Sequence, residues 1–385
     1  MTAVRPKILL IDDNPDFGGH QVMAAYGLEG ILRYGRWEVQ ALRHPLNEKN
    51  LERWSAMAAG DGAVRLRTGV SPTQTGKFQA VRRHFQKAAL NRLHEIIVNE
   101  RPDLVLLIQG NIEQCCTAFL LKGRVTCPVL SYIPVPHKHA EMGAKLGALR
   151  DLTCRGLYAE PDGFITISET LAGMLRDYGA TGRIQVVENG IPLERFESLP
   201  GREEARQRFG LPKDGFIWGQ VGRTEFKQKG QDFALDLFLE RTREKEDEHL
   251  AFLGSGPDSE RLKIRAAGHS NVHCLPWTED PSSFYAAVDA LIMPSRYEGV
   301  PLAMLEAIAS AVPVASTDRD GMRDWLPDTW RFKYRDLQSG LGVLDSVRRV
   351  DTSTINDLKD RVWRNHSIEA FQRSFNAGLE EWLAK

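Results

Sequence analysis

Two cations in the second half of the chain have the types and spacing of groups that hold a phosphate ligand. Arg223 and Lys229 lie six positions apart, between Gly222 and Gly230, in the segment GRTEFKQKG. A guanidinium can bind phosphate through two hydrogen bonds and an ammonium adds a point charge, so the pair could neutralise a diphosphate without a metal ion. The alternative for both residues is an exposed, charged turn.

Two carboxylates follow in PSRYEGVPLAMLEAIASAVPVAS, residues 294–316. Glu298 and Glu306 have seven residues between them. A carboxylate beside a phosphate is repulsive unless it binds some other group, and sugar hydroxyls are the groups that suit it. The two carboxylates therefore point to a ligand that carries hydroxyl groups as well as phosphate.

The elements around these carboxylates form a strand, a glycine-bearing loop, a helix and a second strand. The apolar run Val288–Met293 predicts a buried parallel strand. A helix is expected from about Pro301 to Ala311, because proline suits the first helical turn, and a strand over Val312–Ser316 follows. Such a unit places free N–H groups and a helix amino terminus at the carboxyl edge of a sheet, where an anion is favoured.

The segment GRTEFKQKG, residues 222–230, which we call the cation loop, also lies between a predicted strand, Phe216–Val221, and a helix from about Gln231.

Two neighbouring patterns give weaker evidence of a ligand site. Gly254-Ser255-Gly256 lacks the third glycine of a dinucleotide fingerprint and is expected to be a plain strand-to-helix loop. Asp318-Arg319-Asp320 resembles a metal-binding D-x-D, but a solvated loop is the favoured interpretation, and no metal site is predicted.

The amino-terminal half opens with a predicted strand at Lys7–Ile11, the adjacent Gly18 and Gly19, and a helix from about Val22. Glycines in such a loop let the backbone approach a ligand closely, and a plain turn is the alternative.

Asp12 and Asp13 follow the same strand, where paired acids could hold magnesium in a phospho-receiver domain. That interpretation needs an aspartate at the end of a later strand. The nearest candidate strand ends in Ile108 and comes too far along the chain, so the receiver hypothesis is rejected.

Two histidines come directly after another predicted strand, Pro128–Val135. Open α/β sheets bind ligands beyond the carboxyl ends of their strands, which makes His137 a candidate site residue. His139 is a weaker candidate whose role the sequence does not assign.

The segment Val81–Val98 predicts one amphipathic helix whose polar face carries Arg82, Arg83 and Lys87. The favoured interpretation is a helix that covers the sheet and exposes a charged face. The alternative is a helix lying on an anionic membrane surface.

Length and composition set the class of protein. A chain of 385 residues favours two domains, and 42% hydrophobic with 26% charged residues is ordinary for a globular protein. The net charge of −1 gives no reason to expect nucleic acid. Five scattered cysteines read as reduced thiols, and neither a signal peptide nor a membrane-length apolar run is evident. We expect a cytoplasmic protein, with the inner face of the membrane as the alternative location.

The ordered motifs resemble the retaining GT-B glycosyltransferases of family 4, the glycosyl transferases group 1. Glu298 and Glu306 resemble that family's E-x7-E element, VGRTEFKQKG its V-G-R…K-G phosphate loop, and VENGI its P-N-G-V segment, with Glu188 replacing the proline. FLGSGP, NVHCLPW and VPVAST follow in the family's order, and GGH near the amino end fits its first glycine loop. The resemblance covers most of the chain and is densest over residues 186–325.

The resemblance implies an α/β, GT-B architecture of two Rossmann-like domains facing a cleft, with the C-terminal helix crossing back to the N-terminal domain. Residues 1–195 would form the acceptor-side domain, completed by the returning helix at 366–385. Residues 196–365 would form the domain that binds the nucleotide-sugar donor.

The resemblance also implies roles for the donor-domain residues. Arg223 and Lys229, beside Gly222, would neutralise the diphosphate leaving group. Glu298 would bind hydroxyls of the donor sugar, and Glu306 would bind the ribose hydroxyls.

Further roles implied by the resemblance concern the backbone and one histidine. The backbone at Gly299, Val300 and Pro301 would approach sugar or phosphate. His137 would contact the donor sugar near the reacting carbon, and the Gly18-Gly19 loop would close over the phosphates.

The implied reaction moves a sugar from a UDP- or GDP-sugar to a hydroxyl of a glycan, glycolipid or small molecule, with retention of configuration and no metal or other cofactor. Polysaccharide biosynthesis is the implied setting. Two segments depart from the family's pattern. DRDGMRDWLP stands where the family often has a glycine pair and a glutamate, and the segment around His137 has a second histidine and two prolines. The alternatives are another reaction on this fold, such as sugar-nucleotide epimerisation or glucan synthesis, or a silent binding module.

Overall fold

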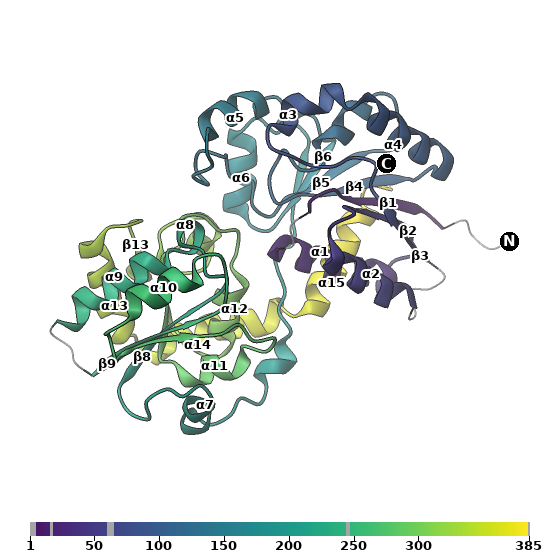
Figure 1. The fold of residues 1–385 in the computed structure, drawn as a ribbon. Helices are drawn as coiled ribbons and strands as arrows, with labels where there is room; N and C mark the ends of the chain where they lie inside the picture. Colours follow the sequence, from purple (N-terminus) through teal and green to yellow (C-terminus); the bar gives the residue numbers. More distant parts are fainter. Residues whose placement is uncertain (1–4, 16–17, 60–64, 244–246, 384–385) are drawn as a thin grey trace. The chain divides into compact units, whose positions relative to one another are not determined.

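The computed structural model describes residues 5–15, 18–59, 65–243 and 247–383. The chain divides into two compact units, which we call unit 1 (Met1–Gly190 with Ile368–Lys385) and unit 2 (Ile191–Ser367). Each unit is a parallel sheet covered by helices (Figure 1).

Unit 1 is organised around a seven-stranded parallel sheet in the order β3-β2-β1-β4-β5-β6-β7. The central strands β1, β4, β5 and β6 are short and almost wholly buried, as expected for parallel strands covered on both faces. Their bounds are β1 Lys7–Asp12, β2 Glu38–Arg43, β3 Leu66–Val70, β4 Leu104–Ile108, β5 Val129–Tyr132, β6 Gly163–Thr166 and β7 Arg183–Val186.

The helices of unit 1 cover this sheet and include the last helix of the chain. Their bounds are α1 Gly19–Tyr34, α2 Glu48–Ala59, α3 Gln79–Arg82, η1 Arg83–Phe85, α4 Lys87–Glu100, η2 Cys116–Leu121, α5 Gly147–Cys154, η3 Leu157–Ala159, α6 Glu169–Asp177 and α15 Ile368–Glu380, with η marking 3₁₀ turns.

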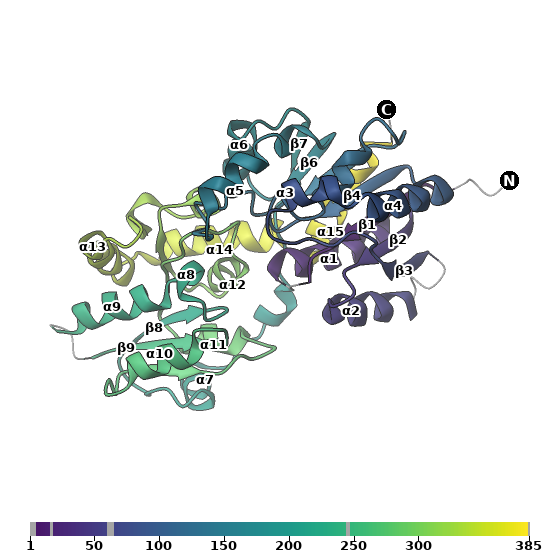
Figure 2. The ribbon, with the colours of Figure 1, turned by 45° about the horizontal axis from the view of Figure 1, so that its top comes forward.

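Helix α15 packs against α1, as both ribbon views show (Figures 1 and 2). Gly27 and Gly30 make the close approach possible, since a Cβ on Gly30 would lie 2.7 Å from the Cβ of Gln372. The ring of Phe375 meets Tyr132 of β5 edge to face at 5.5 Å. The predicted C-terminal helix that returns to the N-terminal domain is confirmed, since α15 belongs to unit 1.

The single helix predicted over residues 81–98 is wrong. The chain leaves helical geometry at Gln86 (φ −90°, ψ 41°), which separates α3 and η1 from α4. Arg83, assigned to the exposed charged face, is buried and donates to both carboxylate oxygens of Glu160 at 2.6 and 2.7 Å. Phe85, which helical spacing would place on the apolar face of such a helix, is 82% exposed. The ion pair between buried Arg83 and half-buried Glu160 thus holds this side of the segment inward.

Unit 2 holds a six-stranded parallel sheet in the order β10-β9-β8-β11-β12-β13. Its strands are β8 Phe216–Val221, β9 Glu248–Leu253, β10 Val272–Leu275, β11 Ala290–Met293, β12 Val314–Thr317 and β13 Arg331–Phe332. Its helices and 3₁₀ turns are η4 Leu193–Phe196, α7 Arg202–Arg208, α8 Phe226–Lys229, α9 Gln231–Thr242, α10 Ser259–Ala266, α11 Ser282–Ala287, α12 Leu302–Ala309, η5 Asp320–Asp324, η6 Asp328–Trp330, α13 Leu337–Arg348 and α14 Thr352–Asn365.

The strand-loop-helix-strand unit around the two glutamates is present, with ends that differ from the prediction by about two residues. Pro301 is the N-cap of α12, with an extended ψ of 128°, rather than its first helical residue. The helix ends at Ala309, because Ala311 takes a left-handed φ of 58°. Within the described residues, no helix combines the length and hydropathy that crossing a membrane would require.

Candidate active site

The sheet order of unit 2 creates a switch point between β8 and β11. These two strands pair directly, with Ala290 opposite Trp218, while the chain runs outward from β8 to β10 on one side and from β11 to β13 on the other. Loops that leave the carboxyl ends of strands at such a point diverge and leave room for a ligand. The cation loop follows β8. The loop of residues 294–301, which carries Glu298 and which we call the carboxylate loop, follows β11.

The structure brings Lys229 and Glu298 together at this point, although 69 residues separate them. The Lys229 Nζ lies 2.6 Å from the Glu298 Oε1, and the two side chains are only 23% and 7% exposed. The backbones of the two loops are also joined, because Arg296 N donates to Gln228 O at 2.7 Å. The ion pair is therefore held in place by the loops that carry it.

Gly230 allows these loops to approach. Its φ is +67°, and a Cβ at this position would lie 2.6 Å from the carbonyl oxygen of Pro294. Gln220 of β8 donates its side-chain amide to Lys229 O at 2.7 Å, which fixes the end of α8.

Arg223 is placed differently from Lys229. Its side chain is 64% exposed, and its guanidinium lies 3.6 Å from the carboxylate of Glu225. Gln231, which sequence reasoning missed, donates to Arg223 O at 3.0 Å and accepts from Glu225 N at 3.2 Å. The loop backbone is thus held by Gln231, while the arginine head extends into solvent.

The Gly254-Ser255-Gly256 segment is the strand-to-helix loop that was predicted, and it also packs against the cation loop. Thr224 N donates to Ser255 O at 3.2 Å. A Cβ on Gly254 would lie 2.0 Å from Gly222 O, and one on Gly256 would lie 2.3 Å from Thr224 O. Two glycines that looked ordinary in sequence therefore determine where the cation loop lies.

Gly254→Ala should accordingly shift the cation loop. The expected result is a loss of about 2 kcal/mol or more in unfolding free energy, because Gly254 also has a φ of +147° that alanine disfavours. Chemical denaturation measures this, and Gly268→Ala is the matched control, since its φ is +87° but a Cβ there meets open space. Equal losses in both variants would show that backbone strain alone, and not contact with Gly222, sets the effect.

The loop after β12 supports the carboxylate loop. Asp320 accepts from Glu298 N at 2.8 Å, and Gly321 N donates to Gly299 O at 3.2 Å. Asp320 is buried, so the solvated-loop interpretation of Asp318-Arg319-Asp320 is wrong for this residue. Asp318 instead accepts from Arg323 at 3.0 Å. The two carboxylates of the triplet serve separate partners.

Glu306 lies on α12 and is held by a residue that the sequence did not single out. The hydroxyl of Tyr285, on α11, donates to Glu306 Oε2 at 2.6 Å. Burial raises the pKa of Glu306, and the hydrogen bond from Tyr285 partly offsets that effect. One carboxylate oxygen is thereby committed to the tyrosine. The spacing of Tyr285 in the chain gave no signal of this contact.

In unit 1, a side-chain relay sets the glycine loop. Gly18 N donates to Gln21 Oε1 at 2.6 Å, and Gln21 Nε2 donates to Asp12 Oδ2 at 2.9 Å. Burial raises the pKa of the Asp12 carboxyl to about 7. Around Gly19, a Cβ would meet nothing within 4 Å. Asp12, considered only as a metal ligand from sequence, thus positions the start of α1.

The two candidate histidines of unit 1 are both buried, at 3% and 2% exposure for His137 and His139. The His139 ring nitrogens lie 3.3 Å from Glu113 and 3.2 Å from Asp151. Glu113, His139 and Cys154 each offer one metal-ligand atom, and these three atoms lie within 4.8 Å of one another. Arg150 already donates to the same Glu113 oxygen at 3.1 Å, so this arrangement fits a structural ion-pair cluster better than a metal site.

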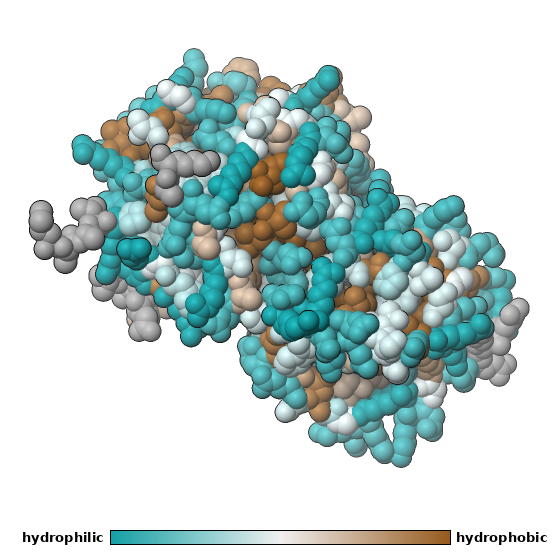
Figure 3. All heavy atoms as spheres, turned by 180° about the vertical axis from the view of Figure 1, so that it is seen from behind, coloured by the Kyte–Doolittle hydropathy of each residue, from teal (hydrophilic) through white to brown (hydrophobic). Residues whose placement is uncertain are grey.

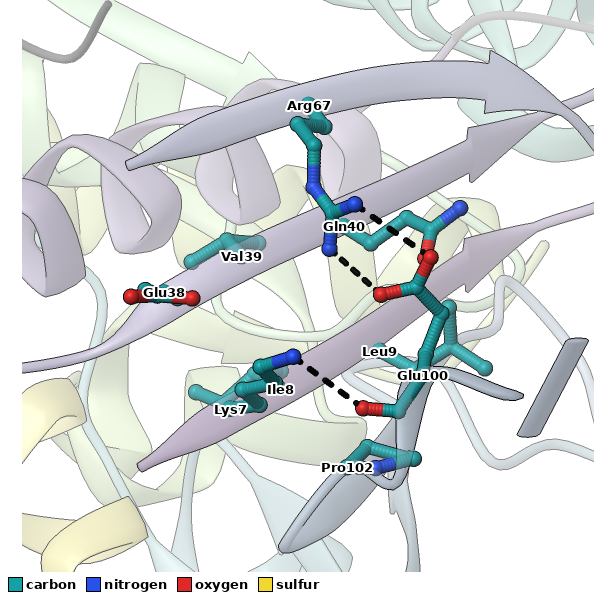
Figure 4. Close-up of a pocket in the computed structure, with 9 residues that line it drawn as sticks. All are labelled: Lys7, Ile8, Leu9, Glu38, Val39, Gln40, Arg67, Glu100 and Pro102. Carbon is teal, nitrogen blue, oxygen red and sulfur yellow. Dashed lines mark hydrogen bonds and ion pairs between the residues drawn. The ribbon is translucent and has the colours of Figure 1, made fainter. Parts of the chain in front are cut away.

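A small cavity between the amino-terminal ends of β1, β2 and β3 is not a ligand site. It measures about 10 Å³ and is closed by the Arg67–Glu100 ion pair and by Lys7, which donates to Glu100 O (Figure 4). That volume is about the size of one water molecule.

Comparison with known proteins agrees with this geometry. Residues 215–337 match the family model described as Glycosyl transferases group 1. The chain is 25% identical over 199 residues to the Escherichia coli UDP-Gal:alpha-D-GlcNAc-diphosphoundecaprenol alpha-1,3-galactosyltransferase, covering 49% of this chain and 50% of that enzyme. It is 33% identical over 198 residues to the putative teichuronic acid biosynthesis glycosyltransferase TuaC of Bacillus subtilis, covering 50% and 47%. The matches thus span about half of each relative.

Solved structures extend the likeness to the whole chain. Sucrose-phosphate synthase from Thermosynechococcus elongatus superposes with a TM-score of 0.74 at 16% identity, covering 99% of this chain and 100% of that one. Anabaena HepE, in complex with UDP and glucose, gives a TM-score of 0.71 at 13% identity, with the same coverage. The predicted GT-B fold is confirmed, and residues 215–337 of the chain match the family model of the group 1 glycosyltransferases.

Proposed function

We propose that the protein is a glycosyltransferase that moves a sugar from a nucleotide-sugar donor to an acceptor hydroxyl. The observation that carries the proposal is the Lys229–Glu298 ion pair at the β8/β11 switch point of unit 2. A cation and a carboxylate held side by side can serve the two halves of such a donor, its diphosphate and its sugar.

The ion pair removes the electrostatic objection to a carboxylate near phosphate. Lys229 neutralises Glu298 through Oε1, which leaves Oε2 able to accept a hydrogen bond from a sugar hydroxyl. The same ammonium attracts the diphosphate and stabilises the charge that develops on it as the sugar departs. Arg223, exposed at the start of the cation loop, supplies a second charge at little cost in reorganisation.

Other parts of unit 2 complete the proposed donor site. The backbone of Gly222 and of the turn at Gly299, Val300 and Pro301 lies at the carboxyl ends of β8 and β11. Glu306 is proposed to bind the ribose hydroxyls through the oxygen that Tyr285 leaves unused. A UDP- or GDP-sugar is the proposed donor; the HepE structure holds UDP, and the E. coli relative is named for UDP-Gal.

The acceptor side is assigned to unit 1. The Gly18-Gly19 loop and His137 lie beyond the carboxyl ends of β1 and β5, and we propose that they contact the phosphates and the donor sugar. The named acceptor of the E. coli relative is a diphosphoundecaprenol-linked sugar, which supports a glycan or glycolipid acceptor here.

We propose that transfer retains the anomeric configuration. The acceptor would attack from the face that the diphosphate leaves, with a departing phosphate oxygen taking the acceptor proton. Glu298 and Lys229 form an ion pair with each other, so we propose neither of them as a covalent nucleophile.

The decisive experiment is a thermal-shift panel of nucleoside diphosphates followed by product analysis. Stabilisation by one base names the donor class. Proton NMR of the first product formed from that donor then reports the anomeric configuration. Stabilisation by no nucleotide, at concentrations up to the millimolar range, would overturn the proposal. A product with inverted anomeric configuration would agree with glycosyl transfer but would contradict retention.

Turnover is expected to persist in excess chelator, since Lys229 and Arg223 supply the positive charge at the diphosphate. The measurement is the initial rate of sugar transfer with EDTA, and again after magnesium is restored. A rate that collapses with EDTA and recovers with magnesium would contradict metal independence.

A further inference from the structure

Helix α5 of unit 1 presents its leucines to solvent. Leu146, Leu149 and Leu152 follow one another at intervals of three, and they are 65%, 50% and 68% exposed. A helix that simply covered a sheet would turn these residues inward. The face of α5 that points outward is therefore its apolar one.

The polar residues of α5 explain this inverted arrangement. Arg150 donates to the buried Glu113 at 3.1 Å, and Asp151 accepts from His139 N at 2.7 Å and from Ala140 N at 3.0 Å. These contacts tie the charged side of the helix to the protein interior. The leucines are thus held in an exposed position by specific hydrogen bonds.

A second apolar ridge lies beside the first. Helix α3 contacts α5 and lies next to it in both ribbon views (Figures 1 and 2). Val81 on α3 and Phe85 on the continuing turn η1 are 44% and 82% exposed. Most of the surface seen in Figure 3 is hydrophilic, with apolar residues gathered in small areas. Five large apolar side chains are thus exposed on α5, its N-cap and the neighbouring segment of α3 and η1.

The charges within the two segments that carry these ridges are mostly positive. The sequence has no aspartate or glutamate between residues 77 and 94, and Asp151 is the single acid between 142 and 156. Asp151 already accepts two backbone hydrogen bonds. The exposed lysines and arginines of the two segments are Lys77, Arg82, Lys87, Arg92, Lys145 and Arg155.

We propose that this surface, which we call the α3–α5 surface, docks unit 1 onto an anionic lipid bilayer. Leucine and phenylalanine side chains would enter the boundary between headgroups and acyl chains, while lysine and arginine heads would stay among the anionic headgroups. Lipid is favoured over a second copy of this chain, because two copies would bring like charges together. This proposal does not depend on which reaction unit 2 performs.

The test is co-sedimentation of the full chain with vesicles of equal parts phosphatidylglycerol and phosphatidylcholine, and with phosphatidylcholine alone. The parent should bind the anionic vesicles, and raising the salt concentration should weaken binding. The double variant Leu149→Asp/Leu152→Asp should reduce binding at least tenfold. Lys145→Glu/Arg155→Glu should reduce it on anionic vesicles only.

Ile264→Asp is the matched control. Ile264 is 67% exposed on α10 of unit 2 and lies between Lys263 and Arg265, but it stands alone rather than in a ridge. The Ile264→Asp protein should bind the vesicles as well as the parent does, and all variants should keep the parent's melting temperature. The proposal would be overturned if the parent did not bind anionic vesicles, or if Ile264→Asp lost as much binding as the leucine variant. A parent dimer that the leucine variant converts to monomer without any vesicle binding would also overturn it.

Discussion

Lys229→Ala is expected to weaken nucleoside-diphosphate binding by about 100-fold and to lower kcat/KM by at least as much. Two effects add. The diphosphate loses the ammonium that attracts it, and Glu298, whose side chain is 7% exposed, is left as an unpaired carboxylate beside the phosphates. Calorimetric titration with the diphosphate selected by the thermal-shift panel gives the affinity.

The second effect can be isolated with a double variant. If repulsion from Glu298 contributes, Lys229→Ala/Glu298→Gln should bind the diphosphate more tightly than Lys229→Ala alone. Lys227→Ala is the control, since Lys227 carries the same charge on the same short helix but faces solvent. A Lys229→Ala protein with the parent's affinity, or a Lys227→Ala protein equally impaired, would show that the ion pair is not the phosphate site.

The sequence was sufficient for the fold because local and global signals agree in it. β1, β4, β8 and β11 are apolar runs followed by glycine- or proline-bearing loops, a pattern that parallel sheets buried on both faces produce. The Lys229–Glu298 contact was within reach of the same reasoning, because both residues follow strands that pair with each other. Motif order then indicated the family, whose model matches residues 215–337, and the solved structures confirm the fold.

What sequence reasoning missed depends on contacts between distant segments. The break at Gln86 follows from the burial of Arg83 against Glu160, 77 residues away, which no helical periodicity reveals. Likewise, Asp320 looks like half of a metal motif until its oxygen is seen to accept from Glu298 N. Polar side chains that hold a loop in place leave no spacing signature. They are visible only once the fold brings their partners to them.

The second large effect we expect is that Glu306→Leu no longer distinguishes a ribonucleoside diphosphate from its dideoxy analogue, because Glu306 is the residue that we propose binds the ribose hydroxyls. A site that is built to hydrogen-bond a hydroxyl rejects the analogue that lacks it, because its own polar group is then left unpaired. The parent should therefore bind the ribonucleoside diphosphate about 100-fold more tightly than the 2′,3′-dideoxy analogue. Glu306→Leu should bring that ratio of affinities close to one, chiefly by lowering the affinity for the ribonucleoside diphosphate.

Tyr285→Phe then separates positioning from binding. Without the tyrosine hydroxyl, the Glu306 carboxyl loses the bond at Oε2 that orients it and that lowers its pKa, so the ribose ratio should fall about fivefold to tenfold while kcat stays within about twofold. Tyr158→Phe is the matched control, because its buried hydroxyl donates to Pro136 O in unit 1. Both variants lose one buried hydrogen bond and should lose similar stability. Only the Tyr285 variant should lose discrimination, since a merely structural tyrosine would change the melting temperature and leave the ratio intact.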